Sequence, residues 1–511
     1  MRPGVDSERS EAPDHPNLQV ERLGGQAKGR RIYWFNSISP SIRYGVHNNN
    51  ILAIERAIKE RLLFVKCKLG AGFTRTEKPI VNFSKSQNLF FMQFQKRSSV
   101  LASLGKHSFL SMYVGRKRTA YEKAFKSIQS NPVQRKDSYI GFFVKCEKIN
   151  FTAKPDAAPR GISPRTPRYH VSIGPYIKRI EKKIYNMIAD IYGAPTVCKG
   201  FNAQRRGAVL RSHWDDFNDP VAVGLDASRF DQHVSADALK FEHSIYKLFF
   251  PHEEQFHKLL NWQINNKFFA RAADGNAKLL LHGGRMSGDM NTALGNCLLM
   301  CSMIYCYMAT KDMKYRLVND GDDCVLIFER KHLRRIDDLS WKFLELGFDM
   351  KVEPHVDVFE KIEFCQSQPV WTAEGWLMVR KVPHSLAKDA ISIKPLNQPK
   401  LARKWCAAVG EGGMSLTGQI PIVQEYYQKF YDFSDGVKPL RGDPTQETGM
   451  SILAKGMKRE YGPIHWMTRL SFWRAFGMSS HKQLVFEQVI KDIRIDLDVR
   501  PSLIPTQSLR I

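Results

Sequence analysis

The stretch Leu317-Val-Asn-Asp-Gly-Asp-Asp-Cys-Val-Leu-Ile-Phe328 places three aspartates and a glycine between two apolar runs. The apolar flanks are typical of strands, and a glycine among aspartates is typical of a tight turn. The stretch therefore predicts a β-hairpin with Asp322 and Asp323 at its bend. Because adjacent carboxylates repel each other, the fold must either leave them in water or hold a cation against them.

The composition of the chain indicates which kinds of molecule it could bind and which compartment suits it. Lysine and arginine number 77 against 51 aspartates and glutamates, which gives a formal charge of +26 over 511 residues. Such an excess favours nucleic acid or an acidic membrane face, although an unspecific basic surface would show the same balance. The nine cysteines form no Cys-x-x-Cys pair, which argues against a zinc finger or a secreted disulfide scaffold and favours a reducing compartment.

The chain shows no membrane or export signal of its own. Residues 1–10 are polar with mixed charge, and no run of about 18 apolar residues occurs. Residues 296–309, the most hydrophobic segment, are better explained as a buried helix. Residues 1–29 are rich in proline, glycine and charge and are predicted to form a mobile arm, with structure starting near Arg30.

Several other segments show clear periodicity. Residues 221–225 are a continuous apolar run that ends on Asp226, as expected for a buried strand that delivers an acid at its tip. Residues 283–288 read as a flexible loop of small residues. Helices are predicted for residues 50–66, 236–249, 420–430, 472–490 and 289–310, the last capped by Ser287 or Asp289.

Asp226 and Asp231, four residues apart, can face the same side if the strand turns into a helix. Beside the hairpin carboxylates, Asp226 with Asp322 and Asp323 would hold two magnesium ions roughly 3.5–4 Å apart around an attacking and a leaving oxygen. An exposed Asp-rich turn alone is usually a solvated loop. Two acidic halves on apolar strands, in a basic protein, point to phosphoryl transfer on a nucleic acid.

At this point the residues match a family. Asp226-x4-Asp231, Ser287-Gly288-x3-Thr292-x3-Asn296 and Gly321-Asp322-Asp323, in this order, resemble motifs A, B and C of the RNA-dependent RNA polymerases of positive-strand RNA viruses. Leu225-Asp-Ala-Ser-Arg-Phe-Asp231 and Pro159-Arg-Gly-Ile-Ser-Pro-Arg-Thr-Pro-Arg-Tyr169 are similar to the replicases of tombusviruses, carmoviruses and luteoviruses. The likeness runs from about Tyr44 to about Gly418.

The resemblance implies a role for each matched residue. Asp226, Asp322 and Asp323 would bind Mg²⁺ or Mn²⁺ at the catalytic centre. Asp231 and Asn296, with Thr292 nearby, would read the 2′-hydroxyl of the incoming nucleotide, a group that both donates and accepts. A reverse transcriptase carries a bulky side chain where Asp231 stands. Ser287 and Gly288 would form a flexible loop near the template base.

The remaining predicted contacts are cationic. Arginine binds phosphate oxygens bidentately, and the resemblance places a motif F at Arg160, Arg165 and Arg168, facing the triphosphate. Lys351 matches the motif D proton donor to pyrophosphate, with an ordinary surface lysine as the alternative. Phe364-Cys365-Gln366 resembles the motif E hairpin. Lys145, Lys148 and Lys154 are candidate contacts to RNA or nucleotide, with a solvated basic face as the alternative. The candidate RNA contacts on the template entry path are Arg116, Lys117 and Arg118.

Asp320 departs from the family pattern, because relatives more often carry an uncharged residue there. It would either influence the choice of metal or point outward without a function.

The implied fold is α+β, a right hand with fingers, an antiparallel palm sheet and a helical thumb. After the arm at 1–29, we expect an N-terminal region and fingers with motif F at 30–215. The palm with motifs A to E follows at 216–375, including a finger insertion at about 245–282, and the thumb at 376–511.

The implied activity is template-directed RNA synthesis that starts without a primer. The implied partners are RNA template and product, ribonucleoside triphosphates, a membrane-associated viral replication protein, host factors and a second copy of the chain. The implied location is the host cytoplasm, in replication complexes that a partner attaches to membranes. An RNA-binding scaffold and a nuclease are the alternatives, and the ribose-reading pair favours synthesis over hydrolysis.

Overall fold

A four-stranded antiparallel sheet lies at the centre of the functional region. The computed structural model describes residues 1–35, 42–67, 70–440, 450–493 and 495. The sheet has the order β13-β14-β10-β15, and every neighbouring pair is antiparallel. Its strands are β10 (Pro220–Ala227), β13 (Tyr315–Asn319), β14 (Asp323–Glu329) and β15 (Met350–Val352). The predicted strand at 221–225 is thus confirmed and extends through Asp226.

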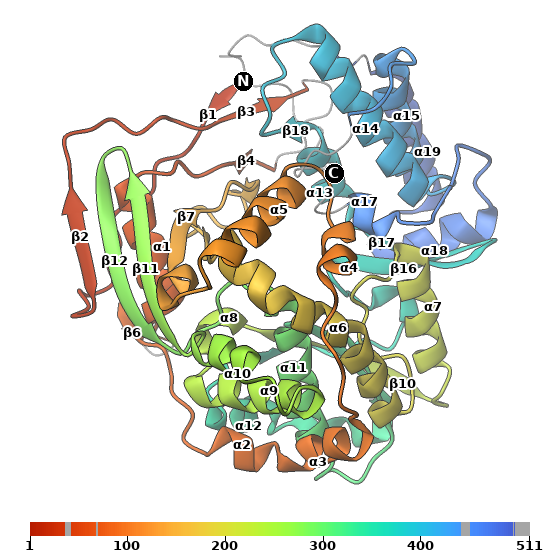
Figure 1. Ribbon diagram of the computed structural model, residues 1–511. Helices are drawn as coiled ribbons and strands as arrows, with labels where there is room; N and C mark the ends of the chain where they lie inside the picture. Colours follow the sequence, from red (N-terminus) through yellow and green to blue (C-terminus); the bar gives the residue numbers. More distant parts are fainter. Residues whose placement is uncertain (36–41, 68–69, 441–449, 494, 496–511) are drawn as a thin grey trace.

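Both faces of this sheet are buried, which explains why its strands read as continuous apolar runs. Alternate residues such as Val221 and Leu326 enter one hydrophobic core, and Ala222 and Ile327 enter the other. The first core is filled by α6 (Pro167–Tyr192), α9 (Ala236–Phe249), α11 (Thr292–Met308) and α12 (Leu339–Glu345), together with α2 (Phe83–Ser86) and α3 (Asn88–Arg97). Figure 1 shows these helices gathered in the lower half of the molecule.

The second core lies between the sheet and the C-terminal part of the chain. It combines α7 (Ala203–Trp214), the hairpin of β16 (Ser367–Thr372) and β17 (Gly375–Arg380), and helices that follow residue 381. Because α6 packs on α9 and α11, and α7 packs on β13, β14 and β17, the packing crosses the boundary predicted at residue 215. The later helices are α13 (Val382–Asp389), α14 (Pro399–Thr417), α15 (Val423–Ser434), α17 (Met450–Leu453), α18 (Trp466–Phe476) and α19 (Ser480–Asp492).

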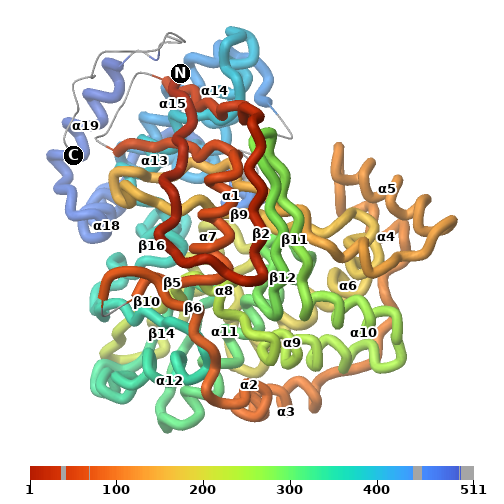
Figure 2. Tube along the Cα trace, turned by 90° about the vertical axis from the view of Figure 1, so that its left-hand side faces the viewer, coloured from red at the N-terminus to blue at the C-terminus, as the bar shows by residue number. Residues whose placement is uncertain are grey.

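A second sheet has five strands in the order β2-β12-β11-β7-β9. Its strands are β2 (Leu18–Arg22), β12 (Gly275–His282), β11 (Asn265–Ala272), β7 (Ile140–Val144) and β9 (Gly161–Ile162), and α1 (Ile51–Ile58) packs against it. Figure 2 shows β2, β11 and β12 side by side along the face turned to the viewer. The long β11–β12 hairpin comes from the segment expected as an insertion at about 245–282.

The prediction that structure starts near Arg30 is wrong. β2 pairs antiparallel with β12, and Asp14 forms an ion pair of 2.8 Å with the buried Lys59. Leu18 and Val20 alternate with polar residues and pack against the core under this sheet, which is the period of a strand. The surrounding prolines, glycines and charges hid that short signal.

The first residues also contact the C-terminal part. β1 (Arg2–Pro3), β3 (Arg31–Trp34) and β18 (Ile391–Ser392) form a three-stranded sheet, and Phe35 stacks on Trp405 of α14 with ring centroids 5.4 Å apart. Figure 1 shows the N-terminus beside β18 and α14. Residues far apart in the chain are thereby joined at one edge of the molecule.

Three predicted helices differ in extent. The helix predicted at 50–66 ends in a π-helical turn, η1 (Lys59–Leu63), followed by β5 (Phe64–Lys66). The helix predicted at 472–490 is two helices, α18 and α19, broken at Gly477 with φ +73°. The helix predicted at 289–310 begins at Thr292. Residues 496–511 of the predicted thumb lie outside the described part.

The other elements are β4 (Tyr44–Gly45), β6 (Phe73–Arg75), α4 (Lys106–Ser111), α5 (Gly115–Ser130), η2 (Arg135–Ser138), β8 (Ile149–Asn150), α8 (Phe230–His233), α10 (Glu254–Asn261), η3 (Arg330–Ile336) and η4 (Phe359–Lys361). No described helix combines the length and hydrophobicity that a membrane crossing requires.

Candidate active site

The predicted acidic cluster forms where β10 and β14 pair. Asp226 lies directly opposite Asp323 in the register, and Lys351 of β15 lies opposite Asp226 on the other side. The bend spans residues 320–322, and Gly321 adopts φ +92°, a conformation that favours glycine. Asp323 is therefore the first residue of β14 and does not belong to the bend, whereas Asp322 does, as predicted.

The carboxylates repel each other in this arrangement. Burial and then the neighbouring charges of Asp322 and Asp226 raise the pKa of Asp323 to about 7, although the Cys365 N–H donates to its carboxylate at 2.9 Å. Desolvation by the surrounding protein and then the charge of Asp226 also raise the pKa of Asp322. The negative charge at this point is thus incompletely balanced by the described side chains.

The ligand atoms that these carboxylates offer are of the type that a divalent cation binds. Carboxylate oxygens are the ligands that Mg²⁺ and Mn²⁺ prefer, and a cation would relieve the repulsion that raises the pKa of Asp323. Within the described residues, however, no three His, Cys, Asp or Glu side chains already converge as a complete metal site. Asp226 and Asp322 are exposed, which leaves their side chains room to turn toward a cation.

Asp320 was predicted either to influence the choice of metal or to point outward, but the structure shows it paired with two cationic side chains. Its carboxylate forms ion pairs with Lys199 and with Arg206, the latter at 2.5 Å. Burial opposes ionisation of Asp320, but the two cations outweigh it and hold its pKa below the ordinary value. Lys199 also donates to the Asp320 carbonyl at 3.2 Å, so Lys199 and Arg206 together hold the turn at residues 320–322.

The predicted ribose-reading pair is brought together. Asp231 lies on α8 and Asn296 on α11, and the Asn296 Nδ2 donates to Asp231 Oδ1 at 2.8 Å. Burial raises the pKa of Asp231, against the lowering effects of Asn296 and Arg285. The same carboxylate feels the charges of Asp322 and Arg160, which places it beside the metal-binding candidates.

The loop before α11 packs more tightly than expected. A Cβ on Gly288 would lie 2.6 Å from the Pro164 Cα, so glycine is required here by close packing. The Ser287 hydroxyl lies 3.3 Å from both the Ser163 N–H and the Gly161 carbonyl. Thr292 Oγ1 lies 2.7 Å from the Met286 carbonyl, and neither Ser287 nor Asp289 caps the helix.

The predicted motif F arginines divide into two groups. Arg165 is fully buried and bonds Asp289 at 2.6 Å, the Ser138 carbonyl at 2.6 Å and Asn266 at 2.7 Å. Arg168 bonds Asp137 at 3.0 Å. Protein groups occupy the guanidinium donors of both arginines in this structure, and their predicted contact with the nucleotide stays a prediction.

Arg160 is the exception in that segment. Its side chain is 58% exposed, and its charge acts on both Asp231 and Asp322. Arg160 also pairs with Glu147 at 3.4 Å. An exposed arginine close to the acidic cluster is compatible with the predicted phosphate contact, which stays a prediction.

Comparison with known proteins agrees with this geometry. Residues 18–498 match the protein family described as viral RNA dependent RNA polymerase. The chain belongs to that family. It is 39% identical over 476 residues to the RNA-directed RNA polymerase of Melon necrotic spot virus, with 93% of this chain and 60% of the relative covered. The resemblance read from the motifs is thus confirmed.

Two further relatives give the same picture. The RNA-directed RNA polymerase of Tobacco necrosis virus (strain A) is 38% identical over 511 residues, which covers 100% of this chain and 70% of the relative. That of Turnip crinkle virus is 37% identical over 486 residues, 94% of this chain and 62% of the relative. The chain therefore spans about 60 to 70% of the length of these relatives.

In this member of the viral polymerase family, the lysines near the predicted motif F differ in their contacts and in their exposure to solvent. Lys145 pairs with Glu147 at 2.8 Å, and Lys148 donates to the Lys388 carbonyl at 2.9 Å. Lys154 is exposed. Lys351 is also exposed and lies 3.6 Å from Glu353, beside Asp226 along the sheet. None of these contacts tests a role in binding RNA or in proton transfer.

The predicted template contacts lie on α5. Lys117 lies over the Tyr113 ring at 5.0 Å, and Arg118 pairs with Glu122 at 2.9 Å, while Arg116 is exposed. Figure 2 shows α4 and α5 at one side of the molecule and β10 and β14 at the other.

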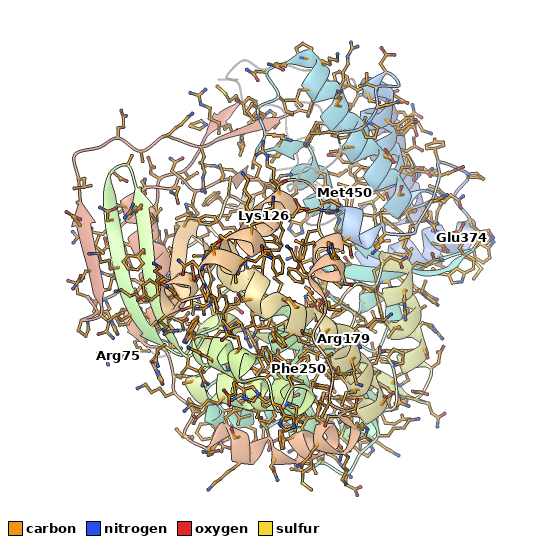
Figure 3. The ribbon with its side chains drawn as sticks, in the orientation of Figure 1. Arg75, Lys126, Arg179, Phe250, Glu374 and Met450 are labelled. Carbon is orange, nitrogen blue, oxygen red and sulfur yellow. The ribbon has the colours of Figure 1, made fainter. Side chains whose placement is uncertain are left out.

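The predicted motif E segment supports the acidic turn. Cys365 and Gln366 adopt φ +51° and +58°, and this turn directs the Cys365 N–H to Asp323. The β16–β17 hairpin that follows turns at Glu374, on the right in Figure 3, which pairs with Arg459 at 2.8 Å. The predicted motif E segment thus contacts Asp323 through its backbone, which no sequence pattern could show.

A cavity of about 740 Å³ lies elsewhere, between the β16–β17 hairpin, the start of α13 and the α18–α19 turn. Its wall includes Lys361, Lys381, His384, Phe476, Lys482 and Phe486, and none of the predicted catalytic residues. The carboxylates at the β10–β14 pairing remain the candidate active site.

Sequence reasoning missed four charged residues that support this site: the buried Arg206, Glu242 and Arg285 and the half-buried Lys199. The available signal was local charge in otherwise apolar or glycine-rich segments, such as Gly283-Gly-Arg285. Their partners are distant in sequence, so the pairs themselves carried no pattern.

Proposed function

We propose that this chain catalyses template-directed RNA synthesis, joining ribonucleoside triphosphates with release of pyrophosphate. The observation that carries the proposal is the β10–β14 register, which sets Asp226 opposite Asp323 beside the Asp231–Asn296 pair. An acidic metal-binding cluster alone would also suit a nuclease. The adjacent ribose reader favours synthesis, because hydrolysis needs no incoming nucleotide.

In the proposed reaction, an RNA 3′-hydroxyl attacks the α-phosphorus of the incoming nucleotide and the bond to pyrophosphate breaks. Asp226, Asp322 and Asp323 would hold Mg²⁺ or Mn²⁺, which supplies charge stabilisation to the attacking and leaving oxygens when bound. Arg160 would bind the triphosphate oxygens. Lys351, exposed beside Asp226, would give a proton to the leaving pyrophosphate.

The right-hand assignment belongs to the same proposal. The four-stranded sheet with its helices would be the palm, the five-stranded sheet with its neighbours the fingers, and the helices after residue 381 the thumb. The Asp226–Asp323 register supports the palm assignment, because it puts the acids at one end of an antiparallel sheet.

Initiation without a primer follows from the resemblance, as does recruitment to cytoplasmic membranes by a viral replication protein. The predicted contributions of host factors and of a second copy of the chain are likewise inferred from the family resemblance. Membrane flotation with and without the replication protein tests recruitment. Flotation of this chain alone would contradict the dependence on a partner.

The decisive experiment measures incorporation of labelled nucleotide on a short RNA template, with Mg²⁺ or Mn²⁺, by wild type and by Asp322→Asn. Asp312→Asn is a matched control, since it removes the same charge from an exposed position with φ +46° that asparagine tolerates. We expect product from wild type and Asp312→Asn but not from Asp322→Asn, with RNA binding retained by all three. RNA binding without product from any of them would favour the scaffold alternative.

A further inference from the structure

A buried ion pair lies directly behind the ribose-reading residues. Glu242 on α9 and Arg285 in the loop before α11 are both almost completely buried, and the two guanidinium nitrogens of Arg285 donate to the two Glu242 oxygens. Glu242 also accepts from the Tyr246 hydroxyl at 2.8 Å and from Asn291 Nδ2 at 2.7 Å. The carboxylate is thus fully engaged, and it fixes the plane of the guanidinium.

The third nitrogen of Arg285 contacts the site itself. Its Nε donates to Asn296 Oδ1 at 3.0 Å, and the Asn296 Nδ2 donates to Asp231 Oδ1 at 2.8 Å. A flipped Asn296 amide would set an NH₂ group against the guanidinium and an oxygen against the carboxylate. Because both hydrogen bonds would be replaced by repulsion, Arg285 permits one amide orientation only.

We infer that Arg285, held by Glu242, is a positioning residue that sets the preference for ribose over deoxyribose. In the enforced orientation Asn296 has a second N–H, and the Asp231 carboxylate can accept a further bond. A 2′-hydroxyl accepts from the first and donates to the second, whereas a deoxyribose leaves both unsatisfied. This inference rests on the proposed function and deepens it.

A glycine in α11 supports the inference independently. A Cβ on Gly295 would lie 2.4 Å from the Arg285 guanidinium and 2.5 Å from the Glu242 carboxylate. The ion pair therefore packs against the helix backbone at the residue before Asn296. Only glycine leaves that space, so the sequence Gly295-Asn296 couples the ion pair to the position of the reading amide.

The test compares kcat/KM for a ribonucleotide with that for its 2′-deoxy analogue. In the double variant Glu242→Leu/Arg285→Met both charges leave together, so that no unpaired charge stays buried. We expect kcat/KM for the ribonucleotide to fall about tenfold and that for the deoxynucleotide to change little. Tyr246→Phe, which keeps the ion pair, should retain the wild-type ratio. Gly295→Ala, which crowds the pair without removing it, should reduce the ratio.

A purely structural role predicts a different result. Loss of packing would lower both kcat/KM values equally, and an unchanged ratio in the folded double variant overturns the inference.

Equilibrium dialysis of GTP and dGTP with Mn²⁺, without RNA, separates this inference from the proposed function. If wild type makes no RNA, the proposed function fails, but a preference for GTP that the double variant loses still supports the role of Arg285. A wild type without any preference for GTP in dialysis or in synthesis overturns it.

Discussion

At the scale of single residues, consecutive aspartates differ because their neighbours differ. Asp320 faces Lys199 and Arg206, which hold its pKa low, whereas burial and adjacent carboxylates raise the pKa of Asp322 and Asp323. The fold thus neutralises one charge with its own cations and leaves the others for a ligand. A run of acids in sequence cannot reveal this division, because the cations that create it lie more than 100 residues away.

The raised pKa of Asp323 predicts a pH-dependent affinity for a divalent cation. Between the ordinary carboxyl pKa near 4 and about 7, folded Asp323 keeps a proton that the unfolded chain has released, so this residue favours folding less as pH rises. A cation competes with that proton. We expect Mn²⁺ to raise the thermal unfolding midpoint more at pH 8 than at pH 6.

The control for this prediction is Asp323→Asn, which has no proton to release. In that variant the shift caused by Mn²⁺ should be smaller and nearly constant with pH. An equally steep pH dependence in Asp323→Asn would assign the effect to another group, such as a histidine.

At the scale of elements, the motif F segment predicts opposite phenotypes for two of its arginines. Arg165 joins the segment to Asp289 and Asn266, and lysine cannot reach all of these partners. Arg165→Lys should therefore lower the free energy of unfolding by about 2 kcal/mol. Arg160→Ala should change stability by less than about 0.5 kcal/mol but raise KM for nucleotides about tenfold.

Denaturant unfolding and steady-state kinetics on both variants check this contrast. A stable Arg165→Lys with a raised KM would support Arg165 as a nucleotide contact and contradict a purely structural role.

The β13–β14 turn depends on α7 for support. Arg206 on α7 is buried against Asp320, and removal of one partner from a buried pair is costly. Arg206→Met should lower the free energy of unfolding by about 3 kcal/mol, and Asp320→Asn in the same chain should restore at least about 1 kcal/mol of it. Chemical denaturation measures both values.

Arg205→Met is the matched control for this support, because Arg205 is the exposed neighbour on the same helix. It should change the free energy of unfolding by no more than about 0.5 kcal/mol. Additive effects of Arg206→Met and Asp320→Asn would mean that the pair does not hold the turn.

Local sequence patterns predicted the positions of strands and helices more accurately than they predicted which side chains contact each other. The apolar runs at 221–225 and 325–328 correctly predicted the central strands. The order of the motifs correctly predicted that Asp231 and Asn296 lie together. The start of α11 was misplaced because Asp289, a good capping residue, is used by Arg165 instead. The protein contacts of Arg165 were not predicted, because a basic residue in a motif carries no sign of whether its partner is a nucleotide or the protein.

At the scale of the whole molecule, the N-terminal residues act as a strap. They add β2 to the five-stranded sheet and β1 and β3 to the sheet that contains β18. Composition suggested a mobile arm because these strands are short and contribute few apolar residues each. Their pairing partners, β12 and β18, lie hundreds of residues away, so only the assembled fold shows that the segment connects two parts of the molecule.

The net charge of +26 predicts RNA binding that weakens steeply with salt, because each phosphate contact releases a counterion. If α5 contributes, Arg116→Gln/Arg118→Gln should lower the slope of log K against log salt by about 1.4 for single-stranded RNA, since each contact contributes about 0.7. Lys331→Gln/Arg334→Gln on η3 removes the same charge from exposed positions and should leave the slope within about 0.3 of wild type. Equal losses in both variants would indicate that RNA responds to the net charge alone and that α5 is no specific contact. Fluorescence anisotropy of a labelled RNA at several salt concentrations distinguishes these outcomes.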